Sequence, residues 1–187
     1  QLDDETIVRE QRASMLDASA PNPTVEAILH GILPYRYVDH THADAVIAIA
    51  NTPGGEDRLR EIYGDSVVYI PYVKPGFPLA RTCALTFPAQ VTDKAIGMLL
   101  YKHGIFSFGD TAKESYERMI DLVSRAEDYL ARHNAWQIAF PQVAPTERPL
   151  RLELAELRRD LSSIVGAPVL LMSHQDPQVL GFAQRED

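Results

Sequence analysis

The chain has a single cysteine, Cys83, among its 187 residues, so it cannot form an internal disulfide. We expect this thiol to be a small residue of the core, and the protein to belong to a reducing compartment. No apolar run approaches the roughly 20 residues that a membrane-spanning helix needs, and no signal stretch opens the chain. These absences exclude a disulfide-rich secreted protein and predict a cytoplasmic protein without a membrane partner.

Basic residues are also scarce, because 18 Lys and Arg face 26 Asp and Glu, which gives a net charge of −8 and a pI near 5.2. Nucleic-acid binding depends on clustered positive charge, so we expect no nucleic-acid partner. An anionic substrate would need local backbone N–H groups, a metal or a few basic side chains. No Gly-x-Gly-x-x-Gly follows a predicted strand, so this stretch contains no dinucleotide-binding domain.

Helices and strands alternate along a chain of ordinary composition, with 45% hydrophobic and 24% charged residues. This length suits one domain, and we interpret residues 1–187 as a single α/β domain with helices on both faces of a central sheet. The expected helices are 3–17, 24–32, 43–51, 56–63, 79–87, 110–133, 148–165 and 176–182, and the expected strands are 35–42, 66–71, 95–101, 105–108 and 168–172.

The helix expected over 110–133 shows a pattern that predicts its orientation. Asp110 is a suitable capping residue, and Glu114 with Arg118 and Asp121 with Arg125 are spaced as i,i+4 ion pairs for the solvent side. We expect its buried stripe to consist of Tyr116, Ile120, Val123, Ala126 and Leu130.

The sequence Asp-His-Thr-His-Ala-Asp over 39–44 is the strongest chemical signal. Residues i and i+2 of a strand point to one face, so His40 and His42 can reach one metal ion. His103, at the break between two predicted strands, would be the third ligand of a zinc-type site. The doublet alone is not specific, and two strand-end histidines that bind nothing are the alternative.

Four blocks in order, 23–30, 40–42, 71–76 and 103–104, resemble the class II aldolase/adducin family. More narrowly, the segments around His40 and after His103 resemble the aldolase half of bifunctional rhamnulose-1-phosphate aldolase/alcohol dehydrogenases. The resemblance implies a three-layer α/β/α fold with a central mixed, largely antiparallel sheet. It also implies a homo-oligomer, a tetramer in this family, and a dehydrogenase domain fused to the chain in the full-length protein.

The resemblance also assigns roles to individual residues. It implies that His40, His42 and His103 bind zinc or another divalent metal and that Glu26 is the catalytic carboxylate. Tyr72 matches a tyrosine that the family uses from a neighbouring subunit. Thr24 takes the place of a serine that contacts the substrate phosphate.

The implied reaction is the cleavage of a deoxyketose 1-phosphate of the rhamnulose 1-phosphate type to dihydroxyacetone phosphate and lactaldehyde. A Lewis-acid metal stabilises the enediolate without a Schiff-base lysine. Glu26 would move the proton at the enediolate carbon, and the Tyr72 phenol would exchange one with the aldehyde oxygen. The alternatives without a catalytic role are a solvated helix carboxylate for Glu26 and an interface aromatic for Tyr72. His30 is expected to be structural or to orient a metal ligand.

Two departures from the family pattern leave alternatives open. Nothing before Pro23 resembles the family's phosphate-binding loops, and Val25 stands where simpler aldolases have a serine. We therefore expect a fragment whose N-terminal phosphate-binding loops belong to the complete protein. The other interpretations are a pentulose-phosphate 4-epimerase, which has aspartate where this chain has Glu26, and an inactive metal-binding or interaction domain of the adducin type.

Overall fold

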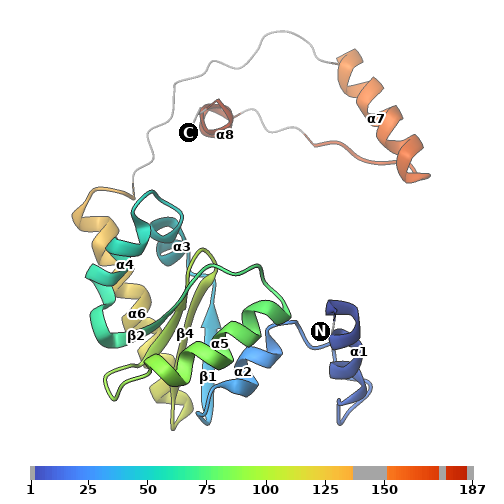
Figure 1. Ribbon diagram of the computed structural model, residues 1–187. Helices are drawn as coiled ribbons and strands as arrows, with labels where there is room; N and C mark the ends of the chain where they lie inside the picture. Colours follow the sequence, from blue (N-terminus) through green and yellow to red (C-terminus); the bar gives the residue numbers. More distant parts are fainter. Residues whose placement is uncertain (1–2, 137–150, 173–175, 185–187) are drawn as a thin grey trace. The chain divides into compact units, whose positions relative to one another are not determined.

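The computed structural model describes residues 3–136, 151–172 and 176–184, and the chain divides into two compact units, 1–136 and 137–187 (Figure 1). The first unit contains a four-stranded sheet in the order β1-β4-β3-β2. Strand β4 (Gly104–Gly109) pairs antiparallel with β1 (Tyr37–Thr41) and with β3 (Gly97–Leu100). Strand β2 (Val67–Ile70) is parallel to β3. The predicted mixed, largely antiparallel sheet is thus confirmed.

Helices cover both faces of this sheet because successive strand residues point to opposite sides. One core contains Val67, Leu99 and Ile105 and packs against α3 (Asp44–Ala50), α4 (Gly55–Tyr63) and α6 (Ala112–Arg132). The other contains their neighbours Val68, Met98 and Phe106 and packs against α2 (Ala27–Ile32) and α5 (Phe77–Gln90). The α/β class and the three-layer arrangement are therefore confirmed.

Helix α6 is rotated relative to the predicted stripe. Tyr116 and Ile120 are 62% and 49% exposed, whereas its buried residues are Ser115, Met119, Leu122, Ala126, Tyr129 and Leu130. The small Ser115 lies against β4, where Ser107 Oγ donates a hydrogen bond to its carbonyl, so a polar residue occupies a core position that hydrophobicity alone does not reveal. The cap is Thr111 rather than Asp110, since Thr111 Oγ1 accepts the hydrogen bond from Glu114 N.

The two predicted i,i+4 ion pairs of α6 are present. Arg118 Nη2 lies 2.6 Å from Glu114 Oε1, and Arg125 Nη2 lies 2.6 Å from Asp121 Oδ2. Both pairs lie on partly exposed side chains, where each contributes a few tenths of a kcal/mol, about 0.3–0.5. They add little to the stability of the helix.

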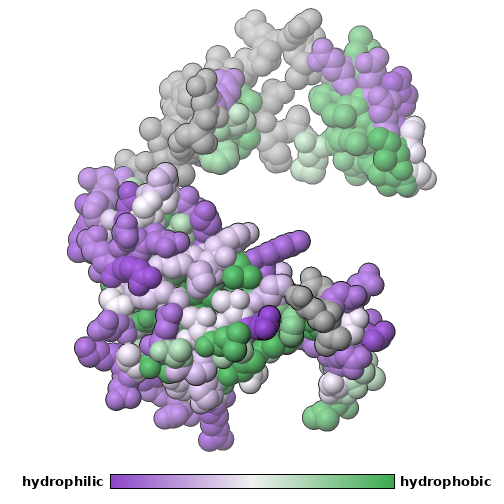
Figure 2. All heavy atoms as spheres, viewed as in Figure 1, coloured by the Kyte–Doolittle hydropathy of each residue, from purple (hydrophilic) through white to green (hydrophobic). Residues whose placement is uncertain are grey.

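The first unit also contains helices α1 and α5. Helix α1 (Asp4–Ala13) is capped by Asp3, whose Oδ1 accepts from Thr6 N. Helix α5 is apolar nearly all round and leaves Leu85 67% exposed on its outer side. Figure 2 shows hydrophobic side chains over α5 and α2, while the surface over α4 is hydrophilic. A helix without a polar face is typical of one that another surface covers.

The second unit contains α7 (Arg151–Val165) and α8 (Pro177–Ala183). The strand predicted over 168–172 is wrong: these residues have no strand partner, and Leu170 and Met172 are 90% and 84% exposed. An apolar run becomes a strand only where a neighbour completes its hydrogen bonds. Residues 148–150 of the predicted helix lie outside the described residues. The single-domain interpretation of residues 1–187 stays a prediction, and in the described ranges no helix is long and apolar enough to cross a membrane.

Candidate metal centre

Three histidines and one carboxylate meet at the end of β1. Glu26 is the residue that precedes α2, His40 lies on β1, His42 follows the last residue of β1, and His103 lies in the turn between β3 and β4. One ligand atom from each lies within 4.8 Å of every other. Within the described ranges this is the one such group of histidine, cysteine or acidic residues.

The strand pairing brings His103 to the other two histidines. Thr41 pairs with Ile105 at the end of the β1–β4 ladder. His42, one residue after Thr41, and His103, two residues before Ile105, are therefore close in space. The β3–β4 turn is tight: Lys102 has a positive φ of 57°, and His103 N donates to Leu100 O over 3.2 Å. The local backbone therefore folds the third imidazole back over the strand end.

Glu26 Oε1 lies at the point on which the imidazoles converge. It is 2.8 Å from His103 Nε2, 3.4 Å from His42 Nε2 and 3.6 Å from His40 Nε2. All three rings therefore present the same nitrogen to one position. This is the arrangement that a shared ligand of the three rings requires.

Gly104 is what allows the rings to approach so closely. A Cβ at this position would lie 2.6 Å from Thr41 O, 2.9 Å from His42 Cδ2 and 3.0 Å from His40 Cε1. These distances are shorter than any that a side chain can accept without movement of the strand or the rings. The absence of a side chain at Gly104 therefore leaves the space that the rings of His40 and His42 occupy.

His40 is held in the tautomer that a metal needs. Its Nδ1–H donates to Ile105 O over 3.0 Å, and its ring stacks on Phe106 with 4.0 Å between centroids. Its Nε2 is buried and has no hydrogen-bond partner. Burial lowers the pKa of His40 to about 4, so at neutral pH the ring is uncharged with a free lone pair on Nε2.

The pKa of Glu26 is lowered although its carboxyl is partly buried. Burial raises the pKa of this carboxyl, but the hydrogen bond from His103 and the attraction of the three imidazoles outweigh it. Glu26 is therefore ionised at neutral pH. An anion beside the uncharged ring of His40 attracts a cation to this position.

The donor set fits a divalent metal. Zinc takes three or four ligands among imidazole nitrogens and carboxylate oxygens at about 2.0–2.2 Å, and a catalytic site keeps one position for substrate. The unpartnered, buried Nε2 of His40 is an orphan that such an ion would satisfy. His42, whose side chain is 54% exposed, keeps the centre open to solvent.

The remaining predicted residues lie outside this group. Thr24 is exposed, and its Oγ1 accepts a hydrogen bond from Glu26 N over 3.2 Å, which helps to turn the chain into α2. Tyr72 is 57% exposed in the loop after β2. The roles of both stay predictions. Cys83 is fully buried, as expected, and burial raises its pKa to about 12.

Phe106 is a feature of the site that the sequence prediction did not include. It is buried and lies between His40, on which it stacks, and His30, whose ring meets it edge-on at 5.4 Å. The register of β1 on β4, in which His40 and Phe106 are direct partners, explains the contact. No pattern within one strand carries that cross-strand information.

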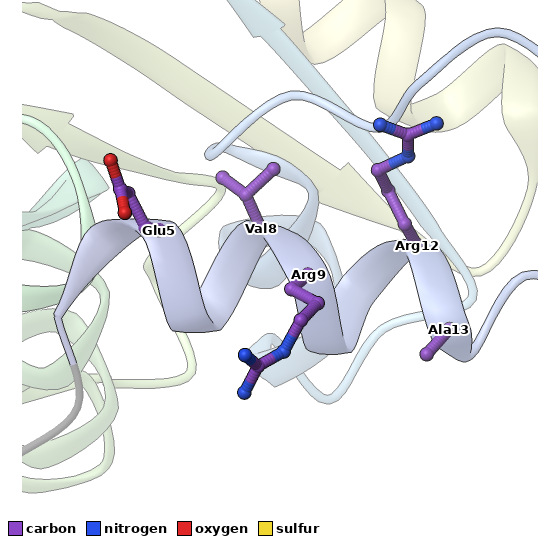
Figure 3. A pocket seen from close by; sticks show the side chains of 5 residues that line it. All are labelled: Glu5, Val8, Arg9, Arg12 and Ala13. Carbon is purple, nitrogen blue, oxygen red and sulfur yellow. The ribbon is translucent and has the colours of Figure 1, made fainter.

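A pocket of about 710 Å³ lies along α1, apart from the histidine group (Figure 3). It is lined by one face of the helix, with Glu5, Val8, Arg9, Arg12 and Ala13. None of the predicted site residues lines it.

A three-layer α/β domain with a His₃Glu group at a strand end defines a class of candidate metalloproteins, and comparison with known proteins identifies the family. Residues 2–130 match the model of the Class II Aldolase and Adducin N-terminal domain. The chain therefore belongs to the class II aldolase/adducin family. The matched region contains the whole His₃Glu group and ends inside α6.

Two solved structures and one curated protein illustrate the relationship. The N-terminal class II aldolase domain of a conserved Thermoplasma acidophilum protein is 42% identical, with a TM-score of 0.61 over 70% of this chain and 59% of that one. An aldolase II superfamily protein from Pseudomonas syringae is 18% identical, with a TM-score of 0.51 over 80% of this chain and 67% of that one, and supports the fold alone. The uncharacterized oxidoreductase YuxG of Bacillus subtilis is 36% identical over 130 residues, which are 70% of this chain. The chain spans 19% of the length of YuxG.

Proposed function

We propose that this chain is a metal-dependent aldolase domain that cleaves a deoxyketose 1-phosphate of the rhamnulose 1-phosphate type to dihydroxyacetone phosphate and lactaldehyde. The observation that carries the proposal is the convergence of three Nε2 atoms on Glu26 Oε1. Membership of the class II aldolase/adducin family supports it. Zinc is the metal that we expect, because the histidine-rich donor set suits it.

A divalent metal held by His40, His42 and His103 would supply a Lewis acid for the negative charge that develops when the C3–C4 bond of the sugar breaks. Glu26 lies beside that position and carries a lowered pKa, so it is available to take the proton from the enediolate-forming carbon in the direction of synthesis and to return it after cleavage. When substrate binds, the carboxylate has to leave the point on which the rings converge.

Tyr72 is proposed to exchange a proton with the aldehyde oxygen from a neighbouring subunit. Its exposure on a surface loop is compatible with a residue offered to another copy. The apolar outer surface of α5 is likewise compatible with a homo-oligomer, which we propose to be a tetramer. Thr24, next to Glu26, is proposed to contact the substrate phosphate, with loops of the complete protein supplying the rest.

The chain is proposed to be part of a longer, cytoplasmic protein. It spans a fifth of a relative that carries the name oxidoreductase, which supports a dehydrogenase domain elsewhere in the full-length chain. The described residues show no dinucleotide-binding pattern of their own. The lyase step is therefore assigned to this part.

The test is a coupled assay for dihydroxyacetone phosphate released from rhamnulose 1-phosphate by the full-length protein, with metal content measured on the same sample. We expect about one zinc or similar ion per subunit and release of the product. A pentulose phosphate is offered in a parallel assay, and its conversion to the 4-epimer, with no release of dihydroxyacetone phosphate from rhamnulose 1-phosphate, would assign the protein to the 4-epimerases. Bound metal with no turnover of either substrate would favour a metal-binding interaction domain.

A matched pair of variants isolates the base. Glu26→Gln keeps the shape of the side chain and removes its charge, so we expect turnover to fall by about 10²- to 10⁴-fold, the usual range for a lost acid–base group. Glu10→Gln, on the exposed side of α1, is the control and should leave turnover unchanged. Equal turnover in the two variants would remove Glu26 from the mechanism.

A further inference from the structure

His30 lies one helical turn after Glu26 but takes no part in the His₃Glu group. Residues i and i+4 of a helix share a face, and Glu26 at the cap of α2 and His30 within it both contact the β1–β4 half of the sheet. Glu26 reaches the three histidines, whereas His30 reaches the backbone of the strand that carries one of them. Glu26 is thus the residue before α2, and His30 lies in its last turn.

The contact of His30 is specific in its chemistry. Its Nδ1 lies 3.1 Å from Val38 O, and because a carbonyl can only accept, Nδ1 must carry the proton and donate it. Val38 is two residues before His40 and lies on the same face of β1. The hydrogen bond therefore ties α2 to the strand that bears the metal-binding imidazole.

Helix α2 is held by its apolar side chains in the core and by one side-chain hydrogen bond to β1. It has six residues, and no side chain caps its first turn. Short helices are marginal by themselves and depend on tertiary contacts. Among the described side chains of α2, Leu29 is the one that is fully buried, and His30 is the one that hydrogen-bonds to β1.

We propose that His30 is a positioning residue, which locks α2 onto β1 through the Val38 carbonyl and thereby holds the Glu26 carboxylate at the point where the imidazoles converge. This inference rests on the proposed function of Glu26 as the base. The same contact sets the reach of the carboxylate when it leaves that point for the reacting carbon. His30 itself touches neither the imidazole nitrogens nor the position of the reacting atoms.

His30 has two contacts, and two substitutions separate them. His30→Asn keeps a donor near the position of Nδ1 and removes the ring that meets Phe106. His30→Phe keeps a ring on Phe106 and removes the donor. Because His30 is exposed, neither change opens a buried cavity, and both variants should fold.

The experiment compares both variants with the unaltered full-length protein by kinetics and by imidazole NMR of the metal-free form. A displacement of about 1 Å in a reacting group can cost about 100-fold, so we expect His30→Phe to lower kcat by about 10- to 100-fold with KM changed less than about threefold. We expect His30→Asn to keep kcat within about threefold of the unaltered protein. The His103 Nε2 resonance, which reports its hydrogen bond to Glu26, should move in His30→Phe and stay in His30→Asn.

The opposite pattern, with His30→Phe normal and His30→Asn impaired, would assign the effect to ring packing on Phe106 and overturn the proposal. Unchanged kcat and an unchanged His103 resonance in both variants would also overturn it. Absence of lyase activity in the unaltered protein would instead refute the proposed function. In that case the NMR comparison still decides whether His30 holds Glu26.

Discussion

The two faces of the sheet use the same strands for different purposes. On the face covered by α3, α4 and α6, alternate strand residues enter a continuous aliphatic and aromatic core. On the face covered by α2 and α5, the core gives way at the β1–β4 end to His40 and the group around it. Because neighbouring residues of a strand point in opposite directions, a change in one core need not reach the other. Substitutions should therefore separate stability from metal binding.

The largest effect on stability is expected at Leu122, which is fully buried in the α6 core. Leu122→Ala should lower the free energy of unfolding by about 2–5 kcal/mol, because it removes buried apolar contacts and leaves a cavity. Denaturant unfolding of the metal-free protein measures this change. Leu16→Ala, at a fully exposed position after α1, is the matched control and should stay within about 0.5 kcal/mol.

The folded Leu122→Ala protein should keep its metal content. A loss of metal in proportion to the loss of stability would show that the two faces are coupled, and the comparison would fail.

The largest effect on metal binding is expected when one of the three imidazoles is removed. His42 is the suitable choice, because its side chain is exposed and its removal does not open the core. His42→Ala should weaken metal binding by at least about 100-fold, since even residues that only support a metal ligand cost about 10- to 100-fold. Titration with zinc against a competing chelator measures the affinity. His133→Ala, at the end of α6, is the control, and equal losses in both variants would contradict the assignment.

The sequence could predict the strand-borne part of this centre. The spacing of His40 and His42 and the break at His103 are local patterns, and the structure brings these residues together with Glu26. The α/β class with helices on both faces of the sheet followed from the order of helices and strands, whereas the mixed, largely antiparallel sheet followed from the resemblance to the family. Oligomer, substrate and the roles of Tyr72 and Thr24 depend on groups outside the described residues.

What the sequence could not predict depends on contacts between elements. The predicted stripe of α6 was wrong at Tyr116 and Ile120, whereas Ala126 and Leu130 are buried as predicted. In the first half of the helix Ser115 packs against β4 instead, which a hydrophobic pattern does not reveal. The strand over 168–172 was wrong because apolar residues alone do not supply a partner strand. The stacking of Phe106 on His40 requires the β1–β4 register. These three features share one physical cause, because each depends on contacts with another helix or strand.

A substitution at Gly104 should affect both stability and metal binding. Gly104→Ala should lower the free energy of unfolding by about 1–3 kcal/mol through overpacking, and it should also weaken metal binding, because the added Cβ meets both His40 and His42. Gly31, where an added Cβ meets nothing within 4 Å, is the control. Gly31→Ala in α2 should raise stability by about 0.5–1 kcal/mol. An unweakened metal affinity in Gly104→Ala would mean that the rings have room to move.

The most gradual expected effect is the pH dependence of stability in the metal-free protein. The groups that face His40 are Glu26, which favours its protonation, and His42 and His103, which oppose it, but burial dominates and lowers its pKa from 6.5 to about 4. Between these values the unfolded chain binds a proton that the native protein does not. Stability therefore falls as the pH drops through this window, by at most about 1.4 kcal/mol per pH unit.

A variant without this imidazole shows whether His40 is the cause. In His40→Gln the free energy of unfolding should depend less on pH between 6.5 and 4.5, and below that range the lowered pKa of Glu26 adds a further loss in both proteins. Leu122→Ala, on the other face, should shift the whole curve downward and leave its slope unchanged, because no titrating group is altered there. Parallel curves for the unaltered protein and His40→Gln would mean that His40 takes up its proton as readily in the folded as in the unfolded chain, and the neutral imidazole required for metal binding would not be a property of the fold.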